Sequence, residues 1–336
     1  MLNPTPSRWR HSATRTFFAA LAIILLPASS EQASVGAFAP ESAAEDASRL
    51  SVPTRDAAKV KAGRATKARE PKFPTARSAG VPRGWEPERS VTGDYVVTKA
   101  GAVVEDLRVT GGNIYVEAPD VTLRRVEVVG GVIANQHTVD ACSSNLLIHR
   151  STVRRVPGQP TVGEFPAISS GSYTARRVKI SGLPEGFRVA GADAGCGRVV
   201  IRNSFARVTP PADCSDWHGD GLQGYLGPHL VLRNTRLDLV SRGDDCGGTA
   251  PFFYPDGQGN TSVDIDGLLV RGGGYSFRLG MPGDVRRLRI VRDDFIFGPI
   301  AVKCALVGAW SAQLVRLDKH GQPVKLRRQR CNTDES

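Results

Sequence analysis

The stretch "LRRVEV" at residues 123–128 is one copy of a short phrase with the pattern apolar, polar, polar, any, any, apolar. Successive copies start 19, 25, 27, 26, 31, 33 and 20 residues apart. Irregular steps of this size indicate a parallel β-helix, in which each coil buries a row of side chains that only its neighbours can cover. The other copies are "VEDLRV" from Val104, "IHRSTV" from Ile148, "ARRVKI" from Ala175, "IRNSFA" from Ile201, "LRNTRL" from Leu232, "IDGLLV" from Ile265 and "VRRLRI" from Val285.

A second row of short apolar strands lies between the phrases. Because side chains alternate across a strand, one residue of each can stack inward from coil to coil. An antiparallel β-sandwich is the competing architecture, but hairpin signals such as Asn-Gly are missing and the phrase would stay unexplained. We therefore predict an all-β single domain over 91–331, a parallel β-helix of about eight coils. Its inward row is Ile114, Ile133, Ile168, Leu222, Phe252, Phe277 and Ile300.

The first 90 residues have the composition of export and linker sequence. Residues 1–30 hold basic residues, the apolar run "FFAALAIILL" and small residues, as in a secretory signal peptide. Residues 31–90 are predicted to be a disordered basic spacer, and 332–336 a short tail. Most of the net charge of +11 comes from the spacer and from the C-terminal stretch 315–330. Extracellular polyanions are candidate contacts for these ends, and solvated charge runs are the alternative.

The six cysteines suit an exported, disulfide-bonded protein. Cys214 and Cys246 lie 13 and 14 residues after their anchor phrases, so stacked coils predict a bridge between them. Cys304 with Cys331 and Cys142 with Cys196 are the remaining predicted pairs.

The two longest steps contain "DCSDWHGDGLQGY" (213–225) and "SRGDDCGGTAPFFYPDGQGN" (241–260), where we place the candidate site. Insertions into a solenoid are normally loops on one face, often the binding face. The catalytic candidates are His218, Asp220, Asp244 and Asp245. The substrate-binding candidates, chosen because aromatic faces stack on sugars and arginine binds carboxylates, are Asp216, Trp217, Gln223, Tyr225, Arg188, Phe253, Tyr254, Arg278 and Lys303.

From about Val91 to Cys331 the chain resembles the right-handed parallel β-helix proteins of the pectate-lyase-like superfamily. The resemblance rests on the coil phrases and on "HGDGLQGY" at 218–225. It implies a secreted carbohydrate-active protein that binds and cleaves an extracellular, acidic polysaccharide. "GDDCGG" is similar to the Asp-Asp segment of polygalacturonase-like hydrolases, but no Gly-His-Gly segment follows it.

Two reactions stay open. A lyase would use His218 as base with Arg188 or Arg278 against the substrate carboxylate, whereas a hydrolase would pair Asp220 with Asp244 or Asp245. A non-catalytic polysaccharide- or envelope-binding module is the alternative function. We expect a monomer outside or at the surface of the cell, with no nucleic-acid partner and no membrane segment once the signal is removed. No cofactor or metal is expected, with calcium at Asp216, Asp244 and Asp245 as the weaker alternative.

Overall fold

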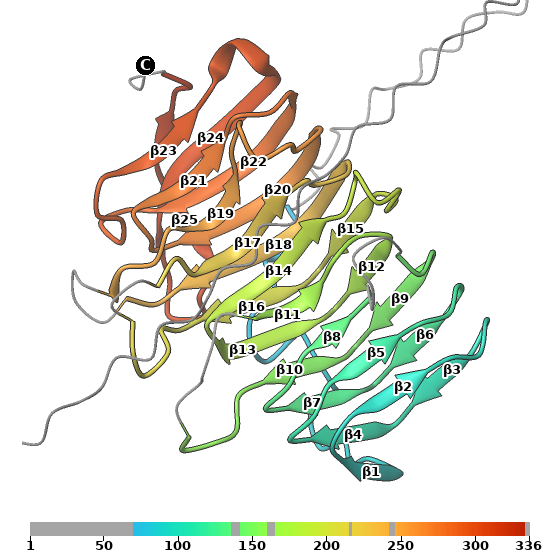
Figure 1. Ribbon diagram of the computed structural model, residues 1–336. Helices are drawn as coiled ribbons and strands as arrows, with labels where there is room; N and C mark the ends of the chain where they lie inside the picture. Colours follow the sequence, from blue (N-terminus) through green and yellow to red (C-terminus); the bar gives the residue numbers. More distant parts are fainter. Residues whose placement is uncertain (1–69, 136–141, 160–164, 215–216, 242–245, 333–336) are drawn as a thin grey trace, which may run out of the picture. The chain divides into compact units, whose positions relative to one another are not determined.

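The computed structural model describes residues 70–135, 142–159, 165–214, 217–241 and 246–332, which form a parallel β-helix (Figure 1). One face is a nine-stranded parallel sheet with one strand from each coil. In chain order its strands are β2 (Tyr95–Val97), β5 (Ile114–Val116), β8 (Ile133–Ala134), β11 (Pro166–Ser169), β14 (Glu185–Ala190), β17 (Asp220–Tyr225), β19 (Ala250–Tyr254), β21 (Tyr275–Leu279) and β23 (Gly298–Val302).

The sixteen-stranded sheet supplies the two other faces of each coil. Its first row is β3 (Val103–Glu105), β6 (Thr122–Arg124), β9 (Leu146–His149), β12 (Tyr173–Arg176) and β15 (Val199–Arg202). Its second row is β1 (Arg89–Thr92), β4 (Leu107–Thr110), β7 (Glu127–Val129), β10 (Thr152–Arg154), β13 (Lys179–Leu183) and β16 (Phe205–Val208).

Both rows merge in the later coils, where one long strand replaces two short ones. β15 and β16 both pair with β18, and the long strands continue in parallel to β24. A 3₁₀ turn, η2 (Cys304–Leu306), precedes β24, and β25 closes the stack by pairing antiparallel to it. The strands are β18 (Leu230–Leu239), β20 (Val263–Arg271), β22 (Gly283–Val291), β24 (Val307–Leu317) and β25 (Pro323–Gln329).

The recurring phrase marks the corner between the two rows. In all eight copies its third residue has a positive φ, with values from 47° to 83°. This residue turns the chain, and its N–H donates to the next coil, as from Arg150 to the Arg176 carbonyl at 3.0 Å. Left-handed backbone favours glycine and asparagine, yet only three copies use them. The corner residues are Asp106, Arg125, Arg150, Arg177, Asn203, Asn234, Gly267 and Arg287.

The predicted inward row is confirmed. The β-sheet register aligns it from coil to coil, with Phe187 between Ile168 and Leu222. Its members are fully buried except Ile300, which is partly buried in the last coil. The rings of Phe252 and Phe277 stack with centroids 4.6 Å apart. A continuous column of this kind explains why single coils are not stable alone.

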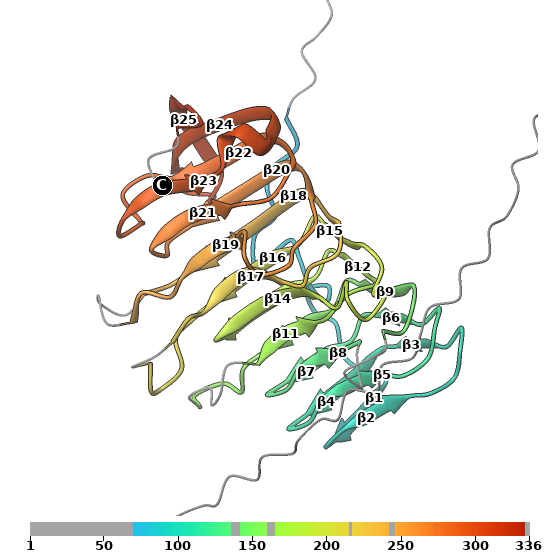
Figure 2. The same ribbon diagram turned by 45° about the horizontal axis from the view of Figure 1, so that its top comes forward.

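Residues 70–88 differ from the predicted spacer, because they form a strap across the coils (blue in Figure 2). Phe73 is 6% exposed and packs on Leu269, Val291 and Val315 of the last coils. Farther along the strap, the Gly80 N–H donates to the Arg177 carbonyl at 2.8 Å. Trp85 reaches the first coils, where its Nε1 donates to Asp106 at 2.8 Å. The remainder of the predicted spacer, 31–69, lies outside the described residues.

All three predicted disulfides are present. Cys214–Cys246, Cys142–Cys196 and Cys304–Cys331 have Cα separations of 5.6, 5.3 and 5.8 Å. The first joins the two oversized coils, and the last ties the C-terminal strand to η2.

The corner geometry makes a testable prediction. Arg177→Gly is expected to raise the melting temperature, because relieving a left-handed arginine at φ 56° is worth about 0.5–1 kcal/mol. Arg176→Gly removes the same charge one residue earlier, at the last position of β12, and should instead cost about 0.5–1 kcal/mol. Thermal unfolding of both variants checks this, and a shift in the same direction for both would contradict it.

Candidate functional site

The outward face of the nine-stranded sheet carries a polar and aromatic column. The register places Arg188, Gln223, Phe253 and Arg278 side by side on β14, β17, β19 and β21. All four are half-buried, since each alternates with a buried residue of the inward row. The sequence prediction is confirmed for their orientation, while their role in binding stays a prediction.

Arg188 and Arg278 differ in how their charges are compensated. The Arg188 guanidinium forms two bonds to the Glu185 carboxylate, with Nε–Oε1 at 2.8 Å and Nη2–Oε2 at 2.7 Å. Arg278 lies over the Phe253 ring, 5.3 Å from its centroid. Its guanidinium has no hydrogen bond or ion pair within the part of the chain that the structure describes. Arg278 is thus the cation of this column that can accept an anionic ligand.

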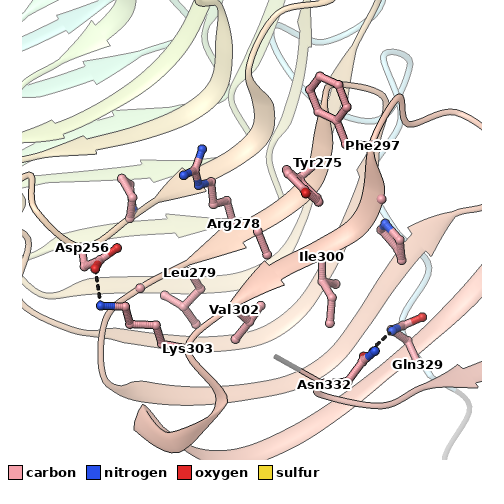
Figure 3. Close-up of a pocket in the computed structure, with 15 residues that line it drawn as sticks. Asp256, Tyr275, Arg278, Leu279, Phe297, Ile300, Val302, Lys303, Gln329 and Asn332 are labelled. Carbon is pink, nitrogen blue, oxygen red and sulfur yellow. Dashed lines mark hydrogen bonds and ion pairs between the residues drawn. The ribbon is translucent and has the colours of Figure 1, made fainter. Parts of the chain in front are cut away.

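A cavity of about 500 Å³ adjoins Arg278 at the C-terminal end of this sheet (Figure 3). Tyr275 and Phe297 line it, with ring centroids 5.8 Å apart, and Phe297 is 73% exposed. Lys303 and Asp256 form an exposed ion pair on its other side, and the bond from Lys303 lowers the pKa of Asp256. The cavity therefore combines a guanidinium, two aromatic rings and one neutralised charge pair.

Asp220 lies inside the solenoid and not on the rim. It is 1% exposed, and its Oδ1 accepts the Ala250 N–H at 3.0 Å. Its Oδ2 is buried without a hydrogen-bond partner in the described structure. Burial, and next the charge of Glu185, raise the pKa of this carboxyl well above its ordinary value. A neutral carboxylic acid is the form that such a position favours.

Glu185 is the partner that the sequence analysis missed. Phe187 pairs with Leu222, and continuing this register by two residues places Glu185 next to Asp220 on the preceding coil. Glu185 is 4% exposed, and its carboxylate is held by Arg188. Coil register combined with the Arg188 prediction is the signal that could have found it.

Two predicted binding aromatics are corrected by the structure, because both are buried. Tyr254 is 0% exposed, alternates in phase with Phe252, and donates its hydroxyl to the Pro228 carbonyl at 2.7 Å. Trp217 is 7% exposed and donates Nε1 to the Pro184 carbonyl at 3.0 Å. Neither ring lies on a surface that a polysaccharide reaches.

The remaining predicted site residues divide into two groups. Tyr225 is 50% exposed on β17, and His218 is exposed just before this strand. Asp216, Asp244 and Asp245 lie outside the described residues, so the hydrolase pairing and the calcium alternative based on them stay untested. Sequence reasoning also missed the cavity residues Asp256, Tyr275 and Phe297.

The burial of Asp220 predicts a pH-dependent stability. Its raised pKa means that the folded state binds a proton more tightly than the unfolded state, so its contribution to stability falls as the pH rises above the ordinary value. Asp220→Asn keeps the acceptor for Ala250 and stays neutral. We expect the melting temperature of the wild type, relative to this variant, to decline steadily from pH 4 to pH 8.

Asp238→Asn is the matched control for this prediction, since Asp238 is also 1% exposed but is held by Arg236 at 2.8 Å. It should lose about 3–5 kcal/mol at neutral pH by leaving a buried guanidinium uncompensated. A constant difference between wild type and Asp220→Asn across this pH range would contradict the neutral carboxyl.

Comparisons of this chain with protein family models, curated proteins and solved structures found no match. The parallel β-helix is therefore established by strand pairing and register alone. Such a fold carries many activities, so the function has to be argued from the site itself.

Proposed function

We propose that this chain binds an acidic polysaccharide at the C-terminal end of the nine-stranded sheet. The observation that carries this proposal is Arg278, which is stacked on Phe253, uncompensated among the described residues, and open to the cavity of about 500 Å³. A guanidinium offers a carboxylate two parallel hydrogen bonds. Phe297 and Tyr275 add apolar faces on which a sugar ring can stack.

The outward column extends this site along the solenoid axis. Gln223 and Arg188 continue from Phe253 toward the N-terminal coils, at the strand spacing of about 4.8 Å. Gln223 offers amide hydrogen bonds to sugar hydroxyls, whereas Arg188 is already neutralised by Glu185. A linear saccharide lying along this column would therefore make its charged contact at Arg278.

The cysteine chemistry supports a setting outside the cytosol. Three disulfides join the chain, and such bonds persist mainly in oxidising compartments. In the described residues no helix has the length and apolarity needed to cross a membrane. An extracellular or envelope polysaccharide fits this setting.

Arg278→Gln is expected to weaken binding of a uronic-acid oligosaccharide by about 10- to 100-fold, the loss of one charged hydrogen-bonded contact. Phe297→Ala should weaken it by about tenfold, through loss of stacking. Isothermal titration calorimetry measures both. Arg292→Gln is the control, because Arg292 is an exposed arginine paired with Asp293 just after β22.

A neutral oligosaccharide of equal length separates charge recognition from general sugar binding. Phe297→Ala should weaken the binding of this neutral ligand, whereas Arg278→Gln should leave its affinity unchanged. Unchanged affinity of Arg278→Gln for the acidic ligand would sink the proposed site.

Cleavage of the bound chain is a second candidate function, favoured by the neighbouring carboxyls of Asp220 and Glu185. Both are buried, but Asp220 favours the neutral acid, whereas the carboxylate of Glu185 is held by Arg188. Carboxyls whose environments differ in this way are typical acid and base partners. With Asp220 only 1% exposed, binding is the better supported function. His218, exposed beside β17, is the base that an eliminating enzyme would use.

If the chain cleaves, Glu185→Gln and Asp220→Asn should each lower turnover about 100-fold or more while leaving affinity within about twofold. Reducing-end release reports hydrolysis, and absorbance of unsaturated products reports elimination. Activity that both substitutions leave unchanged would remove these residues from the chemistry.

A further inference from the structure

The corner between the two rows of the sixteen-stranded sheet carries a ridge of arginines that the proposed site does not use. Arg124, His149, Arg176, Arg202 and Arg233 align by register on successive coils. The next residue of each coil is the left-handed corner residue. We call Arg176 and Arg202 of this line, together with the neighbouring corner residues Arg150 and Arg177, the arginine ridge.

The charges at the two ends of the line are compensated. Near the N-terminal coils, Arg124 binds Glu105 at 2.8 Å and Arg125 binds Asp106 at 2.7 Å. The ion pair lowers the pKa of Asp106 to about 2. Toward the C-terminal coils, acids again pair with the arginines of this line, in the pairs Arg233–Asp264 and Arg287–Asp266.

The arginine ridge has no such partners. None of its four guanidiniums forms a hydrogen bond or ion pair in the described chain, and Arg176, Arg177 and Arg202 are exposed. Burial, and then the charges of Arg176, Arg150, Arg177 and Arg124, lower the pKa of His149. The surface here is therefore strongly positive.

The backbone makes these arginines costly. Arg150 and Arg177 have φ values of 51° and 56°, a region that costs a branched or long side chain about 1 kcal/mol. The equivalent corners of later coils use Asn203, Asn234 and Gly267, which suit this conformation. Arg125 and Arg287 gain ion pairs in return, but Arg150 and Arg177 gain none. Such uncompensated departures from local preference are typical of functional positions.

We propose that the arginine ridge is a second binding surface, which holds an acidic polysaccharide chain along the solenoid axis. Coils repeat at about 4.8 Å, so the ridge presents cations at a spacing that a polymer with one anionic group per sugar can follow. The strands that lead into the ridge, β9, β12 and β15, hold one aromatic residue, Tyr173, which is 1% exposed. Single-stranded nucleic acid would need exposed rings for base stacking. The ridge lies at a corner that does not contain Arg278, so it stands independently of the proposed cavity site.

The test uses a full-chain variant with Arg150→Asn, Arg176→Gln, Arg177→Asn and Arg202→Gln. Asparagine is chosen at the two left-handed corners so that folding is preserved. Fluorescence anisotropy with labelled polygalacturonate should show affinity reduced by about tenfold or more, and a shallower dependence on salt. A variant with Arg292→Gln, Arg316→Gln, Arg327→Gln and Arg328→Gln removes equal charge elsewhere and should stay within about twofold.

Each of the other outcomes contradicts a specific part of the proposal. Equal losses in both quadruple variants would mean that net charge, and not the ridge, binds the polymer. A loss confined to the control variant would assign binding to the C-terminal coils that carry those four arginines, and would overturn the ridge. Tighter binding of an oligothymidine than of polygalacturonate by the wild type would overturn the polysaccharide assignment. Arg278→Gln, measured in parallel with a short oligosaccharide, shows separately whether the cavity proposal holds.

His149 supplies a local readout. Its imidazole pKa, followed by NMR, should rise in the ridge variant because three of the cations that lower it are gone. In the wild type it should rise on adding polygalacturonate, since bound anions compensate the same cations. An unchanged pKa at saturating polymer would place the polymer elsewhere and overturn the ridge.

Discussion

The left-handed corner residue is the constraint on which the stack depends. It turns each coil from the first row to the second, and its N–H donates to the carbonyl of the next coil. The turn and its hydrogen bond together fix the position and the direction of the two flanking strands. The inward side chains of successive coils therefore fall into one column. Hydrophobic burial in that column stabilises the stack only when the corners keep the coils in register.

This constraint separates the features that can be predicted from the sequence from those that cannot, because only residues that follow the coil repeat have a predictable direction. The phrase around Leu123 and the alternation around Leu222 predict the coil order, the inward column and the Cys214–Cys246 disulfide. The same alternation places Tyr254 and Asp220 inward with Phe252 and Leu222, so their burial follows from a rule that the site prediction did not apply. Glu185 needs one more step, the alignment of two coils.

Other features lie outside any periodic rule. Trp217 lies in an inserted loop, where spacing gives no side-chain direction. Its burial comes from packing on Val208 and Leu239, which no periodic rule indicates. Residues 70–88 have the polar, proline-rich composition of a spacer. Their packing depends on isolated anchors: Phe73 packs on the last coils, and Trp85 hydrogen-bonds to Asp106 of the first. Composition averages over such anchors and therefore misses them.

The repeat also explains how one solenoid can carry two cationic surfaces of different chemistry. A corner position and a sheet position recur in every coil, so each can be varied along the axis without disturbing the column inside. On the nine-stranded sheet the variation yields a mixed site, in which Arg278 is framed by aromatic rings and a charge pair. At the corner it yields one sign of charge, with acids retained only at the ends. A mixed site can select one sugar unit, whereas a uniform ridge can hold a long chain in many equivalent positions. The two proposed surfaces together would let the protein bind a polymer along one line and recognise a single residue of it at the other.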